Sequence, residues 1–115
     1  MIKFWLSINK DTQKKRFEER IKSPFKAWKI SPIDEKAQEL WDDITYYKDE
    51  MFRCTHTDLA PWVIVDSNDK KKARLESIRY VLSKFPYDDK DDEKIDFKHN
   101  SKIVKIYSGK RVKNN

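Results

Sequence analysis

Two arginines four residues apart, Arg16 and Arg20, are the side chains of this 115-residue chain best suited to bind phosphate. Residues at this spacing lie on one face of a helix, and a guanidinium group can donate two parallel hydrogen bonds to phosphate oxygens. Residues 10–29, which also contain Lys26 and Lys29, hold eight basic side chains against three acidic ones. Such a cluster predicts binding of a polyanion, although many exposed charges are only solvated.

A second group of polar side chains follows the apolar run at 62–65. It consists of Asn68, Asp69 and Lys70, with Arg74 one helical turn further on. Ligands of open α/β sheets gather outside the carboxyl ends of the strands, so these residues are candidate ligand contacts. The alternative, which the sequence leaves equally open, is a helix cap followed by a solvated lysine run.

Composition and charge exclude several classes of protein. A single cysteine, Cys54, excludes an internal disulfide and a cysteine-based metal site, and His56 and His99 have no partner at metal-ligand spacing. No apolar run approaches the ~20 residues of a membrane span, and no signal peptide is recognisable, so we expect a cytoplasmic protein without membrane contact. The 15 aromatic residues argue against simple disorder.

The elements that must position these side chains can be read from apolar periodicity. The expected order is strand, helix, helix, strand, helix, at roughly 2–8, 11–22, 31–51, 62–65 and 69–85. On the last helix we expect Leu75, Ile78, Leu82 and Phe85 to face inward. Continuous apolar strands joined by helical crossovers predict an α/β fold with a parallel sheet covered by helices. Two strands are too few for such a sheet, so further strands are either lost or supplied by another chain.

Residues 88–115 are expected to be a charged tail. Residues 88–96 hold six acidic and two basic side chains, whereas residues 97–115 hold six basic side chains and no acidic one. An edge strand within 102–110 and a disordered basic tail are equally compatible with this composition.

Five stretches in the right order resemble the C-terminal part of the polyphosphate kinase 2 family. They are Arg16-Phe17 with Arg20, Lys26–Pro32, Trp41–Asp43, Ala60–Val65 and Asn68–Arg74, and the resemblance extends over about residues 2–87. It implies a domain at 1–87 that forms the C-terminal part of a P-loop-kinase-like parallel sheet with a helical lid. The family transfers phosphoryl groups between inorganic polyphosphate and nucleotides, so the implied class is a phosphotransferase.

The resemblance also implies roles for individual residues. Arg16 and Arg20 match arginines of the lid helix and are the implied catalytic residues. The other implied roles are polyphosphate binding for Lys26, Lys29 and Arg74, nucleotide binding for Asn68, Asp69 and Lys70, and support of the lid for Asp42 and Asp43. For the two aspartates an ion pair is favoured over a metal-ligand role, because ion pairs on helix faces are common.

The implied cofactor is Mg²⁺, and the implied partners are polyphosphate and a nucleotide (ADP or ATP, AMP, or GDP), usually in a homo-oligomer. The family's glycine-rich phosphate loop and its magnesium ligands have no counterpart in this sequence, whose one glycine is Gly109. We therefore expect a truncated or split portion that is inactive alone, with an N-terminal half encoded separately as one possibility. The alternatives are a small basic module that binds nucleic acid or another polyanion, and a non-functional fragment.

Overall fold

The computed structural model describes residues 1–85, 98 and 100–109, which fall into two compact units. The sheet unit comprises Met1–Ser7 and the described residues of His56–Gly109, and the helical unit comprises Ile8–Thr55. The predicted domain at 1–87 therefore contains the helical unit and most of the sheet unit. Of the expected charged tail, residues 88–97, 99 and 110–115 lie outside the described residues.

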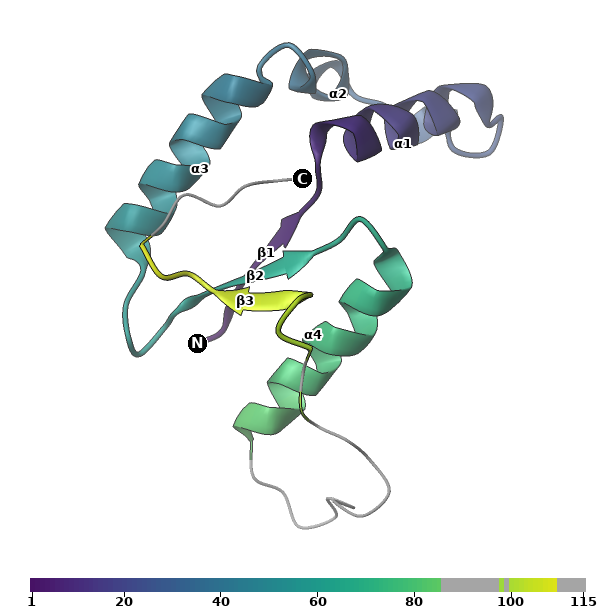
Figure 1. The fold of residues 1–115 in the computed structure, drawn as a ribbon. Helices are drawn as coiled ribbons and strands as arrows, with labels where there is room; N and C mark the ends of the chain where they lie inside the picture. The colour runs from purple at the N-terminus through teal and green to yellow at the C-terminus, as the bar shows by residue number, and fades with distance from the viewer. Residues whose placement is uncertain (86–97, 99, 110–115) are drawn as a thin grey trace. The chain divides into compact units, whose positions relative to one another are not determined.

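A three-stranded sheet in the order β1-β2-β3 forms the framework of the sheet unit (Figure 1). Strand β1 (Lys3–Ser7) pairs in parallel with β2 (Trp62–Asp66), so the predicted parallel pairing is confirmed. Strand β3 (Val104–Ile106) pairs antiparallel with the other edge of β2, in the region where the sequence left an edge strand open. The sheet is therefore small and mixed.

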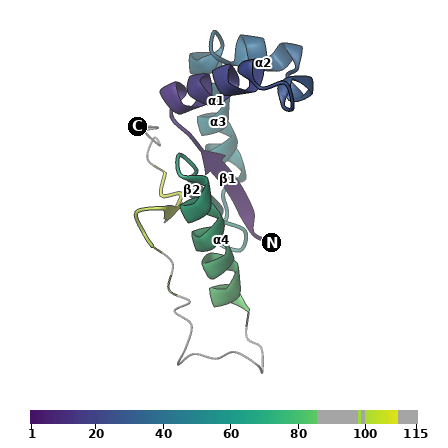
Figure 2. The same ribbon diagram turned by 90° about the vertical axis from the view of Figure 1, so that its right-hand side faces the viewer.

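Helix α4 (Lys70–Lys84) covers one face of this sheet (Figure 1 and Figure 2). Alternate residues of a strand point to the same face, so Val63 and Val65 of β2 both face the helix. They form the core with Val104 of β3 and with Ala73 and Tyr80 of α4, and Ile2, Phe4 and Ile103 pack at its margin. The Phe4 and Tyr80 rings meet edge to face with centroids 5.9 Å apart, which ties the edge strand β1 to the helix.

The buried carboxylate of Glu76 connects α4 to the segment that leads into β3. One oxygen accepts a hydrogen bond from Arg79 Nη1 at 2.7 Å, and the other accepts one from the backbone N–H of Asn100 at 2.6 Å. Both oxygens of this buried charge are thereby satisfied, which is the condition under which burial of a carboxylate is tolerated. The contact fixes the start of the turn that precedes β3.

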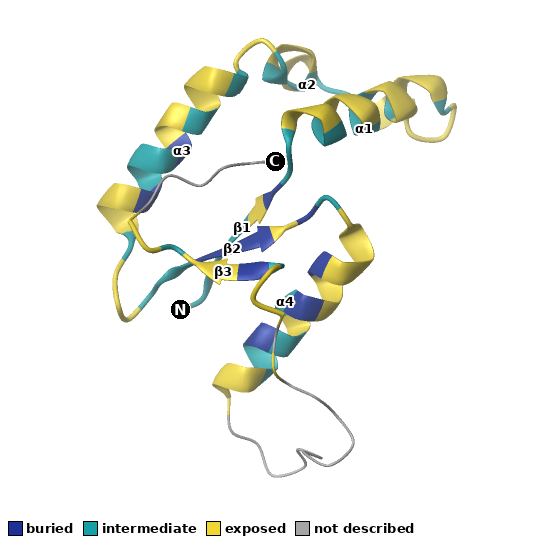
Figure 3. Ribbon diagram, in the orientation of Figure 1, coloured by how far each residue is buried: buried dark blue, intermediate teal, exposed yellow. Residues whose placement is uncertain are grey.

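The face that α4 presents to the sheet differs from the prediction. Periodicity predicted an inward stripe of Leu75, Ile78, Leu82 and Phe85, but the structure buries Ala73, Glu76 and Tyr80 instead (Figure 3). Both sets have helical spacing, so periodicity alone could not choose between them. The observed face combines the small Ala73, a large ring that meets Phe4 and a carboxylate with two partners. Leu75, Ile78 and Phe85 are consequently exposed.

The helical unit begins with α1 (Lys10–Lys22), close to the predicted helix at 11–22. Its N-cap is Asn9, whose side-chain oxygen accepts a hydrogen bond from Thr12 N at 2.7 Å. The helix ends at Ser23, immediately before Pro24, as proline's restriction of its predecessor predicts. A short 3₁₀ turn, η1 (Ala27–Lys29), follows.

The long helix predicted from residue 31 onward is interrupted. It forms α2 (Pro32–Ala37) and α3 (Trp41–Thr55), with a turn at residues 38–40. The interruption coincides with Gln38, whose side chain reaches across to α1. A contact between two helices, which the local sequence does not encode, thus accompanies the break. No helix within the described residues is long and apolar enough to cross a membrane.

Candidate functional site

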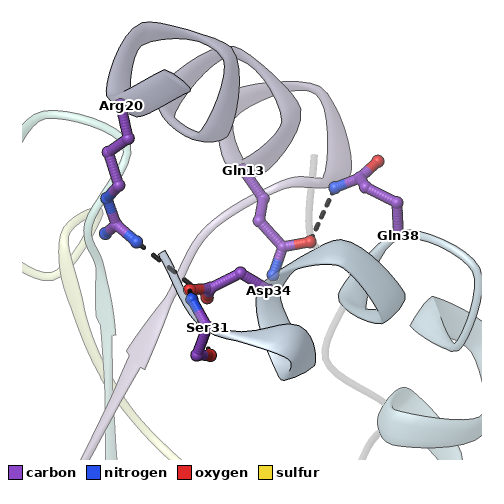
Figure 4. Close-up of polar contacts among 5 residues, drawn as sticks. All are labelled: Gln13, Arg20, Ser31, Asp34 and Gln38. Carbon is purple, nitrogen blue, oxygen red and sulfur yellow. Dashed lines mark hydrogen bonds and ion pairs between the residues drawn. The ribbon is translucent and has the colours of Figure 1, made fainter. Parts of the chain in front are cut away.

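An ion pair between two helices holds Arg20, the second arginine of the predicted phosphate site. Its Nη1 lies 3.9 Å from Asp34 Oδ1 in the first turn of α2 (Figure 4). The other oxygen of Asp34 accepts a hydrogen bond from Ser31 N at 2.9 Å, within the capping box that starts α2. Asp34 therefore orients Arg20 while it caps its own helix.

A second contact joins α1 to the chain just after α2. Gln38 Nε2 donates to Gln13 Oε1 at 2.6 Å and to the backbone oxygen of Lys10 at 3.3 Å (Figure 4). Gln13 and Arg20 lie seven residues apart, about two helical turns, so both contacts are on one side of α1. Together they fix the rotation of this helix and hence the direction of Arg16, which lies between them.

Arg16 and Arg20 come from consecutive turns of α1, as their spacing predicted. Both are half-buried, and the side chain of Arg20 retains 41% of its exposure beside Asp34. An arginine held on one side and open on the other can still donate hydrogen bonds to an anion. The sequence did not identify Asp34 or Gln38 as positioning residues, because their partners depend on how the helices pack.

The turn after α1 carries Lys26 and Lys29 on its exposed surface. Trp28, between them, does not pack in a core and is 77% exposed. Its Nε1 donates to Phe25 O at 2.8 Å, and Lys29 Nζ lies 5.5 Å from its ring centroid. The turn is folded by this local hydrogen bond, which leaves the ring and both ammonium groups at the surface.

Asp42 and Asp43 lie in the first turn of α3, and not in the middle of a longer helix as expected. Both are exposed, and neither takes part in an ion pair within the described part of the chain. At a helix N-terminus their negative charge stabilises α3 through the helix dipole. Further along α3, hydrogen bonds from Arg53 at 2.8 and 3.3 Å lower the pKa of Glu50.

The second predicted group lies in the sheet unit, directly after the carboxyl end of β2. Asp69 is the N-cap of α4: its Oδ1 accepts from the backbone N–H groups of Lys71 and Lys72 at 3.1 and 3.2 Å. The N–H and the amide of Asn68 both donate to Asp66 Oδ1, at 3.0 and 2.9 Å. These contacts show that part of the group shapes the strand-to-helix turn.

Lys70 and Arg74 occupy the first and second turns of α4, and both are exposed. Their spacing places them on one face of the helix near its start, where the helix dipole also favours an anion. The structure thus brings Asn68, Asp69, Lys70 and Arg74 together within the sheet unit. Arg16, Arg20, Lys26 and Lys29 are brought together within the helical unit.

A pocket of about 470 Å³ occupies the opposite end of the sheet unit. Its lining includes Ile2 before β1, Pro61 before β2 and Phe85 after α4, together with His56. His56 Nδ1 accepts a hydrogen bond from Trp62 N at 3.1 Å, and this contact holds the start of β2. The pocket contains none of the predicted site residues, so it does not belong to the candidate phosphate site.

A metal site is not formed by the described residues. Within 1–85, 98 and 100–109, no three His, Cys, Asp or Glu side chains converge as ligands for an ion. The exposed Asp42 and Asp43 are neighbours on one helix, and magnesium requires further oxygen ligands in octahedral geometry. These residues therefore do not fit the Mg²⁺ that the resemblance implied.

The structure combines a parallel strand pair with a helical crossover, and basic side chains lie after a strand and on the crossover helix. This combination defines an α/β fold suited to bind phosphate groups. Residues 1–93 match the family model of polyphosphate kinase 2 (PPK2), and the chain belongs to this family. The match also establishes the fold class that the sequence predicted, the C-terminal part of a P-loop-kinase-like domain.

Curated relatives and a solved structure agree with this assignment. Polyphosphate kinase PPK2B of Corynebacterium glutamicum is 50% identical over 93 residues, which are 81% of this chain and 30% of that protein. A GDP-polyphosphate phosphotransferase of Mycolicibacterium smegmatis is 48% identical over 93 residues, 81% of this chain and 33% of that protein. The crystal structure of Polyphosphate Kinase 2 from Arthrobacter aurescens TC1 has a TM-score of 0.69 and 35% identity, and the match covers 78% of this chain and 35% of that chain.

This chain spans about a third of the length of the curated relatives that it matches. It contains the elements from β1 through α4 of the family match, while β3 lies beyond the matched residues.

Proposed function

We propose that this chain forms the lid region and the final strand and helix of a phosphotransferase. The enzyme would transfer phosphoryl groups between inorganic polyphosphate and nucleoside mono- or diphosphates. The observation that carries the proposal is the family match over residues 1–93, within which Arg16 and Arg20 lie on one oriented helix. The relative in Mycolicibacterium smegmatis is named as a phosphotransferase of GDP and polyphosphate, which supports this substrate class.

In this proposal α1 supplies the positive charge for the transferred phosphate. Phosphoryl transfer needs positioning and charge stabilisation more than covalent chemistry from the protein. Arg16 and Arg20 bind oxygens of the phosphate chain, and the ion pair with Asp34 restricts Arg20 to one orientation before the substrate arrives. Lys26 and Lys29 bind phosphates further along the chain as mobile point charges.

The sheet unit would bind the nucleotide. Asn68, Asp69 and Lys70 follow the carboxyl end of β2, where ligands of α/β sheets bind, and Arg74 adds positive charge for polyphosphate. ADP or ATP, AMP and GDP all remain in the proposed range of nucleotides. Asp42 and Asp43 support the lid through the start of α3.

The described residues do not form a magnesium site, so we assign no step to Mg²⁺ in this chain. Its carboxylate ligands and the glycine-rich phosphate loop would come from the remaining part of the kinase domain, in a cytoplasmic homo-oligomer. That part could be encoded with this chain or separately.

Binding of polyphosphate tests the proposal with charge-matched variants. Arg16→Gln/Arg20→Gln and Lys14→Gln/Lys15→Gln each remove two positive charges from α1. We expect the arginine pair to weaken polyphosphate binding about tenfold or more, because forked hydrogen bonds to phosphate are lost. The lysine pair should weaken it only about two- to threefold, through the general field. Equal losses of polyphosphate affinity in the two variants would contradict a phosphate site formed by Arg16 and Arg20.

A second candidate function is supported by the aromatic side chains beside this cluster. Phe25 and Trp28 are 84% and 77% exposed next to Lys26 and Lys29, and exposed aromatic rings among lysines can stack on the bases of single-stranded nucleic acid. Competition separates the two functions. If single-stranded RNA displaces polyphosphate efficiently and Trp28→Ala abolishes RNA binding, the nucleic-acid module is favoured.

A further inference from the structure

The outer surface of α4 carries a second apolar stripe in addition to the face that packs on the sheet. Leu75, Ile78 and Leu82 follow each other at intervals of three and four residues, which places them within about 60° around the helix. Leu75 and Ile78 are 49% and 56% exposed and Leu82 is half-buried, and the helical spacing puts them on the side opposite the buried Ala73 and Tyr80. Phe85 is the non-helical C-cap and lines the pocket of the sheet unit, so it is not part of this stripe. We call Leu75, Ile78 and Leu82 the outer stripe.

An apolar stripe of this length on a helix of a water-soluble unit normally packs against another element. A helix that buries one face against a sheet usually has a polar opposite face, and a helix that is apolar on both faces usually lies between two layers. Here Leu75 and Ile78 remain about half exposed in the described part of the sheet unit. Isolated exposed apolar residues are ordinary, whereas three apolar residues in helical register can mark an interaction surface.

The charges of α4 select the kind of partner. The helix carries six basic side chains and one acidic one, Glu76, whose carboxylate is already held by Arg79 and Asn100. Lys71 lies one helical turn before Leu75, in line with the outer stripe, and Arg74 lies to one side of it. A second copy of the same helix would bring like charges together along the contact, which opposes self-association. A helix with acidic side chains on either side of an apolar face would be complementary.

The family match indicates where such a helix comes from. Helix α4 lies within the residues that match PPK2, and the curated relatives are about three times as long as the matched segment. Larger domains bury a greater fraction of their surface, so elements that lie at the surface of a small unit become internal in a larger domain.

We propose that the outer stripe of α4 is a docking surface for an amphipathic helix with acidic flanking side chains, contributed by the remaining part of a polyphosphate kinase 2 domain. The origin of the partner rests on the proposed function, whereas the surface rests on the exposed stripe and its charges. Such a partner would explain why Leu75 and Ile78 fit a helical apolar pattern and yet stay exposed on the side of α4 away from its buried residues.

Photo-crosslinking tests the surface directly. The full chain would be co-expressed with the part of the Corynebacterium glutamicum relative that lies outside the matched segment. A benzoylphenylalanine would replace Ile78 in one sample and Lys72 in a control. Lys72 is exposed and lies about 100° around the helix from the centre of the stripe. We expect a crosslink to the relative's segment from position 78 and none from position 72.

Binding measured with substituted chains gives an independent readout. Leu75→Gln/Ile78→Gln should weaken the complex about tenfold or more, because apolar side chains at the centre of a contact dominate its affinity. Lys72→Gln should change it less than about twofold. Both variants replace exposed side chains with a good helix former, so circular dichroism should show unchanged helix content and melting.

Several results would overturn the proposal. These are no complex with the unsubstituted chain, equal crosslinking from positions 72 and 78, or crosslinking only between copies of this chain. All measurements are made without nucleotide or polyphosphate. A complex that forms through position 78 but transfers no phosphate would leave this inference standing and would contradict the proposed function.

Discussion

Asp34 has two separate functions in the helical unit, and they can be measured separately. Its Oδ2 closes the capping box with Ser31, and its Oδ1 pairs with Arg20. Asp34→Ala removes both contacts and should lower the free energy of unfolding by about 1–2 kcal/mol, most of it from the lost cap. Asp34→Asn retains an acceptor for Ser31 N and should cost less than about 1 kcal/mol, the value of a partly exposed ion pair.

Urea denaturation followed by circular dichroism measures both Asp34 variants. If Asn were as costly as Ala, the cap would not be the main contribution of this residue.

Asp69 is a helix cap in the structure and a proposed nucleotide contact. Because its Oδ1 accepts from two N–H groups at the start of α4, Asp69→Ala should destabilise the chain by about 1 kcal/mol. Asp69→Asn should be within a few tenths of a kcal/mol of the unsubstituted chain, since asparagine caps helices equally well. Thermal denaturation checks the pair, and equal melting temperatures for all three chains would show that the cap does not matter.

Tyr80 makes the stability of the sheet unit sensitive to alkaline pH. Burial raises the pKa of its phenol above the ordinary value of 10.0, because the ionised form is disfavoured in the core. A group with a raised pKa contributes stability fully below its unfolded pKa, and this contribution is lost as the pH rises through the folded pKa. The chain should therefore lose stability above about pH 10.

Tyr80→Phe isolates this effect from the other tyrosines. The variant should show a smaller loss of unfolding free energy between neutral pH and pH values above 10 than the unsubstituted chain. An identical alkaline slope in the two proteins would contradict the assignment to Tyr80.

At the level of elements, strand β3 is the part of the sheet unit that lies beyond the family match. Val104 is 1% exposed and packs in the core, whereas the neighbouring Lys105 is exposed. Val104→Ala should lower the free energy of unfolding by about 2 kcal/mol, through lost burial and the cavity that remains. Lys105→Ala is the matched control and should change it by less than about 0.5 kcal/mol. Similar small effects of both would mean that β3 does not contribute to the core.

Element positions could be predicted largely from local signals. Asn9 before α1, Pro24 after it and Asp69 before α4 act through short-range steric and hydrogen-bonding rules, so they can be read from neighbouring residues. The break at residues 38–40 and the choice of the inward face of α4 could not be predicted. Both depend on contacts with residues distant in sequence, namely Gln38 with Gln13 and Tyr80 with Phe4.

In the candidate site, too, local spacing could be predicted from the sequence, whereas contacts between helices could not. The i,i+4 spacing of Arg16 and Arg20 predicted their shared face, but the partner of Arg20 could not be predicted. That partner is Asp34, in the first turn of α2. Its contact with α1 arises only when the two helices pack together.

At the level of the whole molecule, the proposed activity is divided between this chain and the rest of a kinase domain. The chain spans about a third of its curated relatives, and its sequence has one glycine, so a glycine-rich phosphate loop must come from elsewhere. We therefore expect this chain alone to show no detectable transfer from polyphosphate to ADP or GDP. A coupled assay with a purified monodisperse sample checks this, and measurable turnover would show that a phosphate loop is not required.

A chimeric kinase tests the central claim most directly. Residues 1–93 of this chain would replace the matching segment of the Corynebacterium glutamicum relative, and transfer from polyphosphate to GDP and ADP would be measured. We predict an active chimera in which Arg16→Gln/Arg20→Gln lowers kcat/KM about 100-fold or more, as loss of arginines that stabilise a transferred phosphoryl group does, while Lys14→Gln/Lys15→Gln lowers it less than about threefold. A folded chimera without activity, or equal losses in the two variants, would contradict the proposal that this chain supplies a functional lid.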